Sequence, residues 1–432
     1  MANKKARVII IILGIVIIAA TIIVLNSLFK LPQTSWEEKN QDRIKKYSQL
    51  LADPDPHIRL EAVRALGGSG DKSVLPKLVV ALKDENTEVK DSALMAIQAW
   101  GEQSHVEHIK PLLKDENEKI RARAIYVLAK LGGENTKTLL LPFLQDRSAL
   151  VREKTIRALE LFKDEEVLSK IVLRLKDESL MVKRTTIWVL TGFPKEQVVQ
   201  YIQPLLFTKN TLIQGDAAMS LGRLKAKNAV LDLIKLTASK DLYVASSAIT
   251  ALGKIGDNRA KEPLLKILKE YNNDSVIRRE VVLALGEFED KQLKEHLIPL
   301  LEEEESLVRL AVIDIFLRLA DYQDLEQIVS LLEDQEESVR EKAVRVLGQL
   351  KIESTLNNLE KMLTDTSDRV RWSTVEALSK FDNVASRDIL SKALESEKSR
   401  WVKRHIENIL RIIKVTKKNN ESSQSSKSSD KN

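Results

Sequence analysis

Two histidines three residues apart, His105 and His108, are the side chains best spaced for metal chemistry. Glu102 and Glu107 lie beside them, and imidazole and carboxylate groups are common zinc ligands. Nothing else in the surrounding sequence converges on this group, and the chain contains no Cys. We interpret the four residues as a solvated polar cluster beside a helix start. We therefore expect no metal site, no cofactor and no catalytic residue, so that the protein is not an enzyme.

A second group of chemically active residues is periodic, with an acid followed six residues later by a base. The acids are Asp53, Asp84, Asp115, Asp146, Asp177, Glu303, Asp334 and Asp365. The two columns could form a ligand-binding ladder. The simpler interpretation is structural: each acid caps the following helix and pairs with a basic side chain of its own or the next repeat. Both columns are neutral at Thr208 with Gln214 and at Ser239 with Ala245.

The elements that carry these columns repeat along the chain. A β-branched anchor residue precedes each base, and the anchors recur every 31 residues apart from one step of 33. They are Ile58, Val89, Ile120, Val151, Val182, Ile213, Val244, Ile277, Val308, Val339 and Val370. The anchor and the fourth, fifth and eighth residues after it are mostly apolar and share one face of a helix. Each repeat therefore predicts a helix around its anchor.

A Leu-rich stretch before each anchor predicts a first helix, so that each repeat is a helical pair. Proline stands nine residues before the anchor in four repeats, at Pro111, Pro142, Pro204 and Pro299, and predicts a bend in the first helix. In the second helix, glycine follows the leucine that stands eight residues after the anchor, at Gly67, Gly222, Gly253, Gly286 and Gly348. We expect these glycines to end the second helix in a left-handed C-cap.

Composition agrees with long helices and limits the possible partners. The chain is 43% apolar and 31% charged, with only 14 Gly and 10 Pro in 432 residues. Its net charge is +6, but the two ends carry most of the excess, which leaves the body close to neutral. Because general nucleic-acid binding needs a basic surface that displaces counterions, we expect no nucleic-acid partner.

A repeat that contains Asp, then Val-Arg, then Ala and Leu-Gly resembles the HEAT-like repeats first described in phycobilisome lyases. The resemblance covers about Trp36 to Val415 and implies an all-α fold, an α-α superhelix of about twelve helical pairs. The family includes chromophore lyases, deoxyhypusine hydroxylase, alkylpurine DNA glycosylases and many scaffolds. The hydroxylase metal sites contain His-Glu dipeptides, and none occurs here. That activity is excluded, and the chain is identified as a membrane-anchored bacterial member of the HEAT-like group.

An apolar run from Val8 to Leu25 is long enough to approach the thickness of a bilayer core. A cleaved signal peptide is the alternative, although the run is longer than a typical signal core. The basic residues before it favour a single-pass protein of the cell membrane, with a cytoplasmic N-terminus and an extracytoplasmic body. The predicted divisions are a basic flank (1–7), a transmembrane anchor (8–29), a linker (30–35), the repeat solenoid (36–415) and a disordered tail (416–432).

One column of the second helices does not match its expected environment. The sixth residue after the anchor points away from the apolar face and should be polar, as the second residue largely is (Asp91, Glu153, Arg184). It is instead rich in residues that anchor interfaces. The predicted partner-binding stripe consists of Met95, Tyr126, Arg157, Trp188, Met219 and Leu283. The family resemblance implies that second helices line a concave wall, which would place the stripe inside a groove.

The sequence therefore predicts a membrane-tethered scaffold for protein–protein interaction, with a monomeric body and a protein partner of unknown identity. The first alternative is a lyase-like enzyme subunit that handles a chromophore or other ligand, which would need a nucleophile or an acid–base pair in the groove. The second alternative is a nucleic-acid-binding HEAT protein, which the near-neutral body disfavours.

Overall fold

The computed structural model describes residues 33–133, 135–270, 274–288, 290–319, 324–381 and 383–412. All regular elements in these ranges are helices, which confirms the predicted all-α solenoid of helical pairs. The predicted basic flank, transmembrane anchor and disordered tail, residues 1–7, 8–29 and 416–432, lie outside the described residues. The described chain forms two compact units, divided between Phe193 and Pro194.

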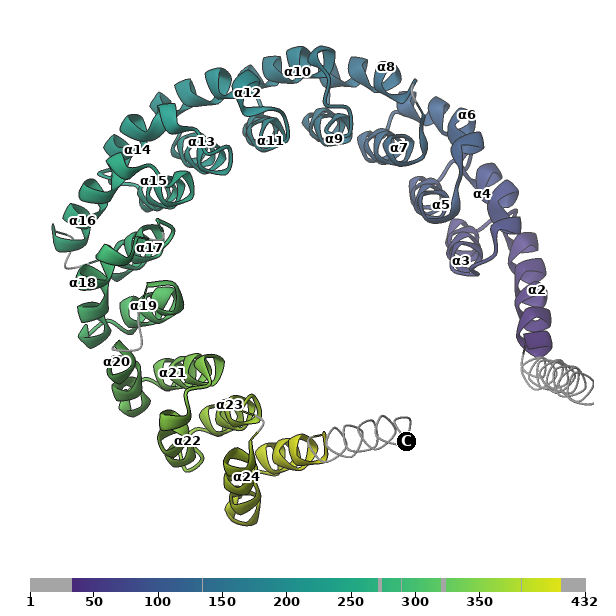
Figure 1. Cartoon of the computed structure of the whole chain (residues 1–432). Helices are drawn as coiled ribbons and strands as arrows, with labels where there is room; N and C mark the ends of the chain where they lie inside the picture. Colours follow the sequence, from purple (N-terminus) through teal and green to yellow (C-terminus); the bar gives the residue numbers. More distant parts are fainter. Residues whose placement is uncertain are drawn as a thin grey trace, which may run out of the picture. The chain divides into compact units, whose positions relative to one another are not determined.

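The first unit has two layers of helices, which alternate along the chain (Figure 1). Its first-helix layer contains α2 (Gln33–Leu50), α4 (Leu75–Ala81), α6 (Val106–Ile109), α8 (Thr136–Leu140) and α10 (Glu165–Val172). Its second-helix layer contains α3 (Pro56–Gly67), α5 (Thr87–Trp100), α7 (Glu118–Leu131), α9 (Ala149–Leu159) and α11 (Leu180–Leu190). Helix α2 begins at Gln33, inside the segment predicted as a linker.

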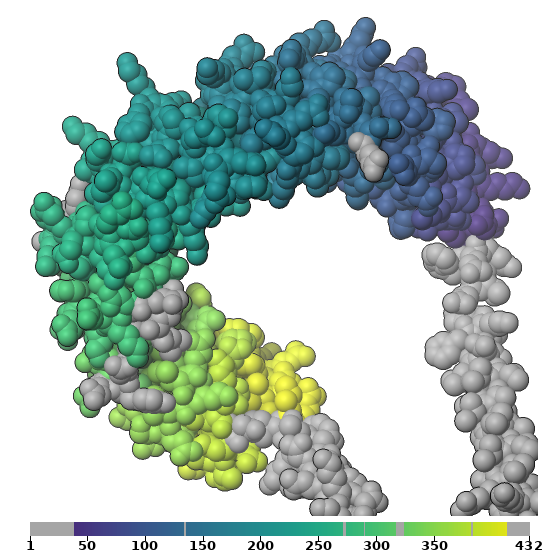
Figure 2. Space-filling view, turned by 45° about the horizontal axis from the view of Figure 1, so that its top comes forward, coloured from purple at the N-terminus to yellow at the C-terminus, as the bar shows by residue number. Residues whose placement is uncertain are grey.

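The second unit repeats the same two layers. Its first-helix layer contains α12 (Lys195–Ile202), α14 (Val230–Leu236), α16 (Lys261–Glu270), α18 (Lys294–Leu297), α20 (Leu325–Ser330), α22 (Leu356–Met362) and α24 (Val384–Ser396). Its second-helix layer contains α13 (Thr211–Arg223), α15 (Leu242–Ile255), α17 (Ser275–Gly286), α19 (Ser306–Leu319), α21 (Glu337–Leu350) and α23 (Asp368–Ser379). Residues 400–412 form a further helix. In the space-filling view, side chains close the gaps between successive ribbons of each unit (Figure 2).

The core of each unit lies between its layers and is built from the apolar face predicted for the second helices. In α5, the anchor Val89 and its partners Ala93, Leu94 and Ile97 are all fully buried. The equivalent residues of α7 are also fully buried. Burial of this stripe is the main stabilising contribution, at about 25 cal/mol for each Å² of apolar surface removed from water.

The periodic prolines mark a change of helix type in the first-helix layer. Each lies at the second position of a 3₁₀ segment that continues an α-helix, over Lys110–Lys114, Leu141–Gln145, Gln203–Phe207 and Ile298–Glu302. Proline lacks an N–H group and its ring collides with the carbonyl four residues earlier, which favours the end of α-geometry. The segments Leu173–Lys176 and Leu331–Glu333 make the same change without proline, so the change belongs to the repeat as well. The first helices therefore change to the tighter 3₁₀ geometry rather than simply bending.

The prediction that the periodic glycines form left-handed C-caps is wrong. Among the described residues, the positive-φ positions are Gly70, Lys225, Gly256 and Lys351, so none of the five predicted glycines adopts that conformation. Gly222 lies within α13, where a Cβ atom would come within 2.7 Å of the Ala251 Cα atom in α15. A Cβ at Gly253 would come equally close to the backbone of Ala284 in the next repeat. These glycines permit close packing between successive second helices.

We expect Gly222→Ala to destabilise the protein by about 1–3 kcal/mol, because the added methyl group overpacks the α13–α15 contact. This loss exceeds the gain of up to about 1 kcal/mol that alanine brings to a helix interior. Urea unfolding followed by far-ultraviolet circular dichroism measures the change. Gly133→Ala is the matched control, because the Cβ added there meets only the movable side chain of Gln103. Equal stability of the two variants would contradict the close-packing role.

The described structure does not support the predicted localisation as a single-pass membrane protein. Across the described ranges, no helix combines the length and apolar character that a bilayer crossing requires. The surface charges of the described helices explain this result: even the long second helices carry a polar face opposite their buried stripe.

Candidate protein-binding groove

The acidic and basic columns form ion pairs between successive repeats. Arg152 in α9 donates from Nε and Nη2 to the two carboxylate oxygens of Asp177, at 2.9 and 2.7 Å. Its Nη1 also donates to the Asp146 carbonyl of its own repeat at 2.9 Å. Arg152 therefore joins the turn of its own repeat to the acid of the next. The other pairs are Arg59–Asp84, Lys90–Asp115, Arg121–Asp146, Arg278–Glu303, Arg309–Asp334, Arg340–Asp365 and Arg371–Glu397.

The acid does not cap the second helix directly, which corrects the sequence interpretation. Asp84 accepts a hydrogen bond from the Asn86 backbone N–H at 2.8 Å, and Asn86 is the N-cap of α5. Asp177 is placed in the same way, two residues before the N-cap Ser179. The acid therefore orders the turn, while the residue after next begins the helix.

Burial and hydrogen bonding act in opposite directions on these acids. Burial raises the pKa of Asp177, but the hydrogen bonds from Arg152 and the Ser179 N–H outweigh it and hold the pKa below its ordinary value. The pKa values of Asp84, Asp146 and Asp365 are lowered by the same balance. Contacts within the protein therefore favour the ionised form of these four acids.

The turns are preserved where the ladder residues are neutral. The Thr208 hydroxyl accepts from the Asn210 N–H at 3.1 Å, and the Ser239 hydroxyl accepts from the Asp241 N–H at 3.2 Å. Gln214 donates from Nε2 to the Leu206 carbonyl at 2.7 Å. Neutral side chains therefore keep the turn geometry without the charge-assisted contact between repeats.

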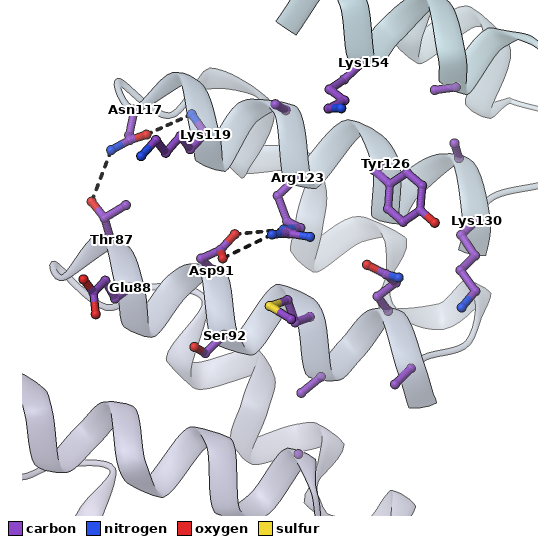
Figure 3. A pocket seen from close by; sticks show the side chains of 18 of the residues that line it. Thr87, Glu88, Asp91, Ser92, Asn117, Lys119, Arg123, Tyr126, Lys130 and Lys154 are labelled. Carbon is purple, nitrogen blue, oxygen red and sulfur yellow. Dashed lines mark hydrogen bonds and ion pairs between the residues drawn. The ribbon is translucent and has the colours of Figure 1, made fainter. Parts of the chain in front are cut away.

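The exposed faces of α3, α5, α7 and α9 form a groove of about 1690 Å³ in the first unit, which we name the second-helix groove (Figure 3). Met95 and Tyr126 lie in it with 51% and 49% of their surfaces exposed. Leu161, two residues after the end of α9, adds a third exposed apolar side chain. Alanines complete the lining between these larger residues. A partner could therefore approach the backbone of this layer closely.

The predicted stripe is only partly brought together by the structure. Met95, Tyr126 and Arg157 line the second-helix groove and are exposed. Trp188 in α11 is half-buried and lies outside the groove lining. Met219 and Leu283 are half-buried and belong to the second unit.

The residues two positions after the anchor are more buried than predicted. Glu153 is 3% exposed, because Arg157 and Lys154 both pair with its carboxylate on the same helix. Asp91 and Arg184 are half-buried. This position lies between the apolar and exposed faces, and neighbouring long side chains cover it.

Positive charge predominates in the groove. The lining contains six basic side chains against two acidic ones, Glu88 and Asp91. Asp91 is paired with Arg123, whose Nε lies 2.9 Å from its Oδ1 (Figure 3). Figure 3 also shows Lys154, Tyr126 and Lys130 around the same space. The groove therefore combines apolar residues with an excess of cations.

Sequence reasoning considered one column and missed its neighbours on the helix. Relative to the anchor, the positions immediately before it and three, six and ten residues after it fall on one face. In α7 they are Lys119, Arg123, Tyr126 and Lys130, and all four line the groove. In the second unit, the residue immediately before the anchor is an exposed apolar side chain in four repeats, at Leu212, Tyr243, Val276 and Leu307.

The described residues offer no arrangement for a metal ion: none of their His, Asp and Glu side chains gather in a suitable group of three or more. His105 and Glu102 instead cap the start of the 3₁₀ helix Gln103–His105, where the Glu102 N–H donates to His105 Nδ1 at 3.2 Å. The groove lining contains no histidine.

The sequence matches the family described as HEAT repeats over residues 44–114, 75–160, 106–179, 208–277 and 325–411, which together cover more than half of the chain. No curated protein matches it. Among solved structures, yeast importin-beta (Kap95p) is similar, with a TM-score of 0.65 and 13% identity over 88% of this chain and 64% of that chain.

Two Kap95 structures with partners named are also similar. Kap95p from a study of its binding to RanGDP has a TM-score of 0.63 and 14% identity, over 88% of this chain and 64% of that one. The Kap95:Nup1 complex has a TM-score of 0.57 and 13% identity, over 87% and 62% of the two chains. The chain spans less than two thirds of the length of these importin chains. At this identity the likeness shows the shared fold alone.

Proposed function

The chain belongs to the HEAT-repeat family, and on that premise we propose that it is a non-catalytic scaffold that binds a protein partner through the second-helix groove. The observation that carries the proposal is the exposure of Met95 and Tyr126 in a groove that nothing in the described chain covers. Methionine and tyrosine supply large contact areas and are typical anchors of protein interfaces. Trp188, Met219 and Leu283 are proposed as additional contact residues.

The similar structures support binding of protein partners as a use of this fold, since Kap95 is named with RanGDP and with Nup1. The closer resemblance to phycobilisome-lyase repeats and a monomeric body stay predictions. A ligand-transferring enzyme would need a nucleophile or an acid–base pair. The groove offers little toward this, because Asp91 is paired with Arg123 and no histidine lines it.

We expect Met95→Ala with Tyr126→Ala to reduce partner capture about tenfold or more, because hot-spot residues each contribute about 2 kcal/mol or more. The measurement is quantitative mass spectrometry of proteins retained by the full chain from cells that produce it. Thermal unfolding should be nearly unchanged, since both side chains are about half exposed.

The matched control is Val80→Ala with Leu173→Ala, which truncates two apolar side chains of the first-helix layer in the same unit that are 66% and 57% exposed. This variant should capture partners as the natural chain does. Equal losses in both variants would contradict a role for the groove. A loss of several kcal/mol of stability in the groove variant would show that these side chains belong to the core.

A further inference from the structure

The distribution of charge along the second-helix groove selects for one kind of partner. Arg64, Lys130 and Arg157 lie in the last turns of α3, α7 and α9. They therefore form one edge of the groove, which we name the basic rim. The two acidic lining residues, Glu88 and Asp91, both lie in the first half of α5. The groove is thus asymmetric: the basic rim contains cations alone, while the opposite edge combines Lys119 with the two acidic residues.

Two members of the basic rim are available to an external acid. Arg64 and Lys130 are exposed, and neither has a carboxylate within ion-pair distance among the described residues. Arg157 is already engaged by the buried carboxylate of Glu153. The apolar surface of Met95 and Tyr126 lies beside this rim, in the middle of α5 and α7. An occupant must therefore present apolar and acidic groups side by side.

We propose that the groove binds an acidic amphipathic helix, which lies across α3, α5, α7 and α9 with its apolar face on Met95 and Tyr126 and its carboxylates along the basic rim. This inference rests on the proposed scaffold function and names the chemistry of its partner. A helix satisfies its own backbone hydrogen bonds, whereas an extended peptide would place unpaired amides against the alanine-rich lining.

The dimensions of the groove suit such a helix. Lys119 and Lys130, near the two ends of α7, are eleven residues apart and hence about 16 Å apart along the helix axis. A helix with its side chains is about 10–12 Å wide and fits between them. Four second helices at about 8–10 Å spacing correspond to a bound helix of about 18 residues.

The competing occupant of a cationic groove is a nucleic acid, and the structure disfavours it. Glu88 would repel phosphates, while Arg123 and Arg157 are neutralised by Asp91 and Glu153. Few uncompensated charges remain for a polyanion, which gains its affinity from many phosphate contacts. A peptide helix needs only a few ion pairs beside an apolar contact.

The test uses the full chain and four labelled probes in fluorescence anisotropy titrations. The first probe is a designed helix of about 18 residues with leucine and alanine on one face and glutamate on the flank. The second carries lysine in place of glutamate, the third has the first composition in scrambled order, and the fourth is a single-stranded oligonucleotide. The acidic amphipathic helix should bind at least about tenfold more tightly than the other three, and added salt should weaken it.

Arg64→Glu with Lys130→Glu should weaken binding of the acidic helix about tenfold or more, because like charges then face each other. Lys114→Glu with Lys170→Glu is the matched control, since both lysines are exposed in the first-helix layer of the same unit. Thermal unfolding of both variants establishes that the fold is retained. Equal or tighter binding of the lysine helix or the oligonucleotide, or no effect of the rim reversal, would overturn the proposal.

The two proposals fail in different ways. Binding of the lysine or scrambled peptide that Tyr126→Ala abolishes would retain the groove as a protein-binding surface and remove the acidic occupant. Retention of partner capture by the variant with Met95→Ala and Tyr126→Ala would instead contradict the scaffold function of the groove itself.

Discussion

Replacing Arg152 with alanine is expected to lower the free energy of unfolding by about 3–5 kcal/mol. Arg152 and Asp177 are 5% and 7% exposed and form a bidentate ion pair. Removal of the guanidinium leaves a buried carboxylate whose remaining partners are the Ser179 N–H and Arg174, with the Arg174 Nη1 atom 3.7 Å from its Oδ2. It also frees the Asp146 carbonyl, to which Arg152 Nη1 donates. Urea unfolding followed by circular dichroism measures the loss.

A double-mutant cycle separates the ion pair from the other contacts of Arg152. Arg152→Met removes the charge but keeps most of the side-chain volume, and Asp177→Asn keeps an oxygen that accepts from Ser179. The double variant should be less destabilised than the sum of the single variants, with a coupling of at least about 1 kcal/mol. Additive losses would contradict a direct interaction between the two repeats.

An exposed ion pair provides the control for burial. Lys110 and Glu107 form a pair within the first-helix layer and are 39% and 74% exposed. Glu107→Ala should change stability by less than about 0.5 kcal/mol, because water already solvates both charges. A similar loss in Glu107→Ala and Arg152→Ala would show that burial of the ladder does not determine its contribution.

Acid should unfold the protein steeply, because many ladder carboxylates have lowered pKa values in the folded chain. Hydrogen bonds from Arg278 lower the pKa of Glu303, and hydrogen bonds outweigh burial at Asp84, Asp146, Asp177, Asp365 and Glu397. A group with a lowered folded pKa stabilises the fold above its unfolded pKa of about 4. That stabilisation is lost as the pH falls through the folded pKa.

We therefore expect the free energy of unfolding to decline slightly below about pH 6.5, because burial lowers the pKa of His405, and to fall steeply below about pH 4. Each carboxylate contributes up to about 1.4 kcal/mol per pH unit while it titrates. Urea midpoints measured across this range at constant ionic strength give the slope. Asp177→Asn should reduce the slope by up to one proton, and an unchanged slope would show that Asp177 has an ordinary pKa in the folded chain.

The repeat architecture follows from the order of residues alone because helical periodicity is local. Val89, Ala93, Leu94 and Ile97 recur at the spacing of one helical face, and all four are buried. Proline at position 111 and its equivalents likewise act on the backbone of their own helix, so that an irregularity was predictable in those four first helices. Exposure of Met95 and Tyr126 followed from the same helical geometry.

Contacts between repeats could be decided only by the tertiary structure. A glycine such as Gly222, which follows the buried face of a helix, is compatible with a C-cap or with close packing. Only the approach of Ala251 from the next helix distinguishes these two roles. The partner of each ladder base was similarly open between its own and the next repeat, until the Arg152–Asp177 contact placed it in the next.

Identification of the second-helix groove required both the sequence and the tertiary structure. The sequence by itself determined which residue of α7 points outward, because the direction of Tyr126 is a property of one helix. The structure decided that Tyr126, Met95 and Arg157 share a groove while Trp188 does not line it. It also brought Arg64 and Lys130, which belong to different repeats, to one edge. Such grouping depends on the packing of successive helices, and no periodicity within a single helix specifies that distance.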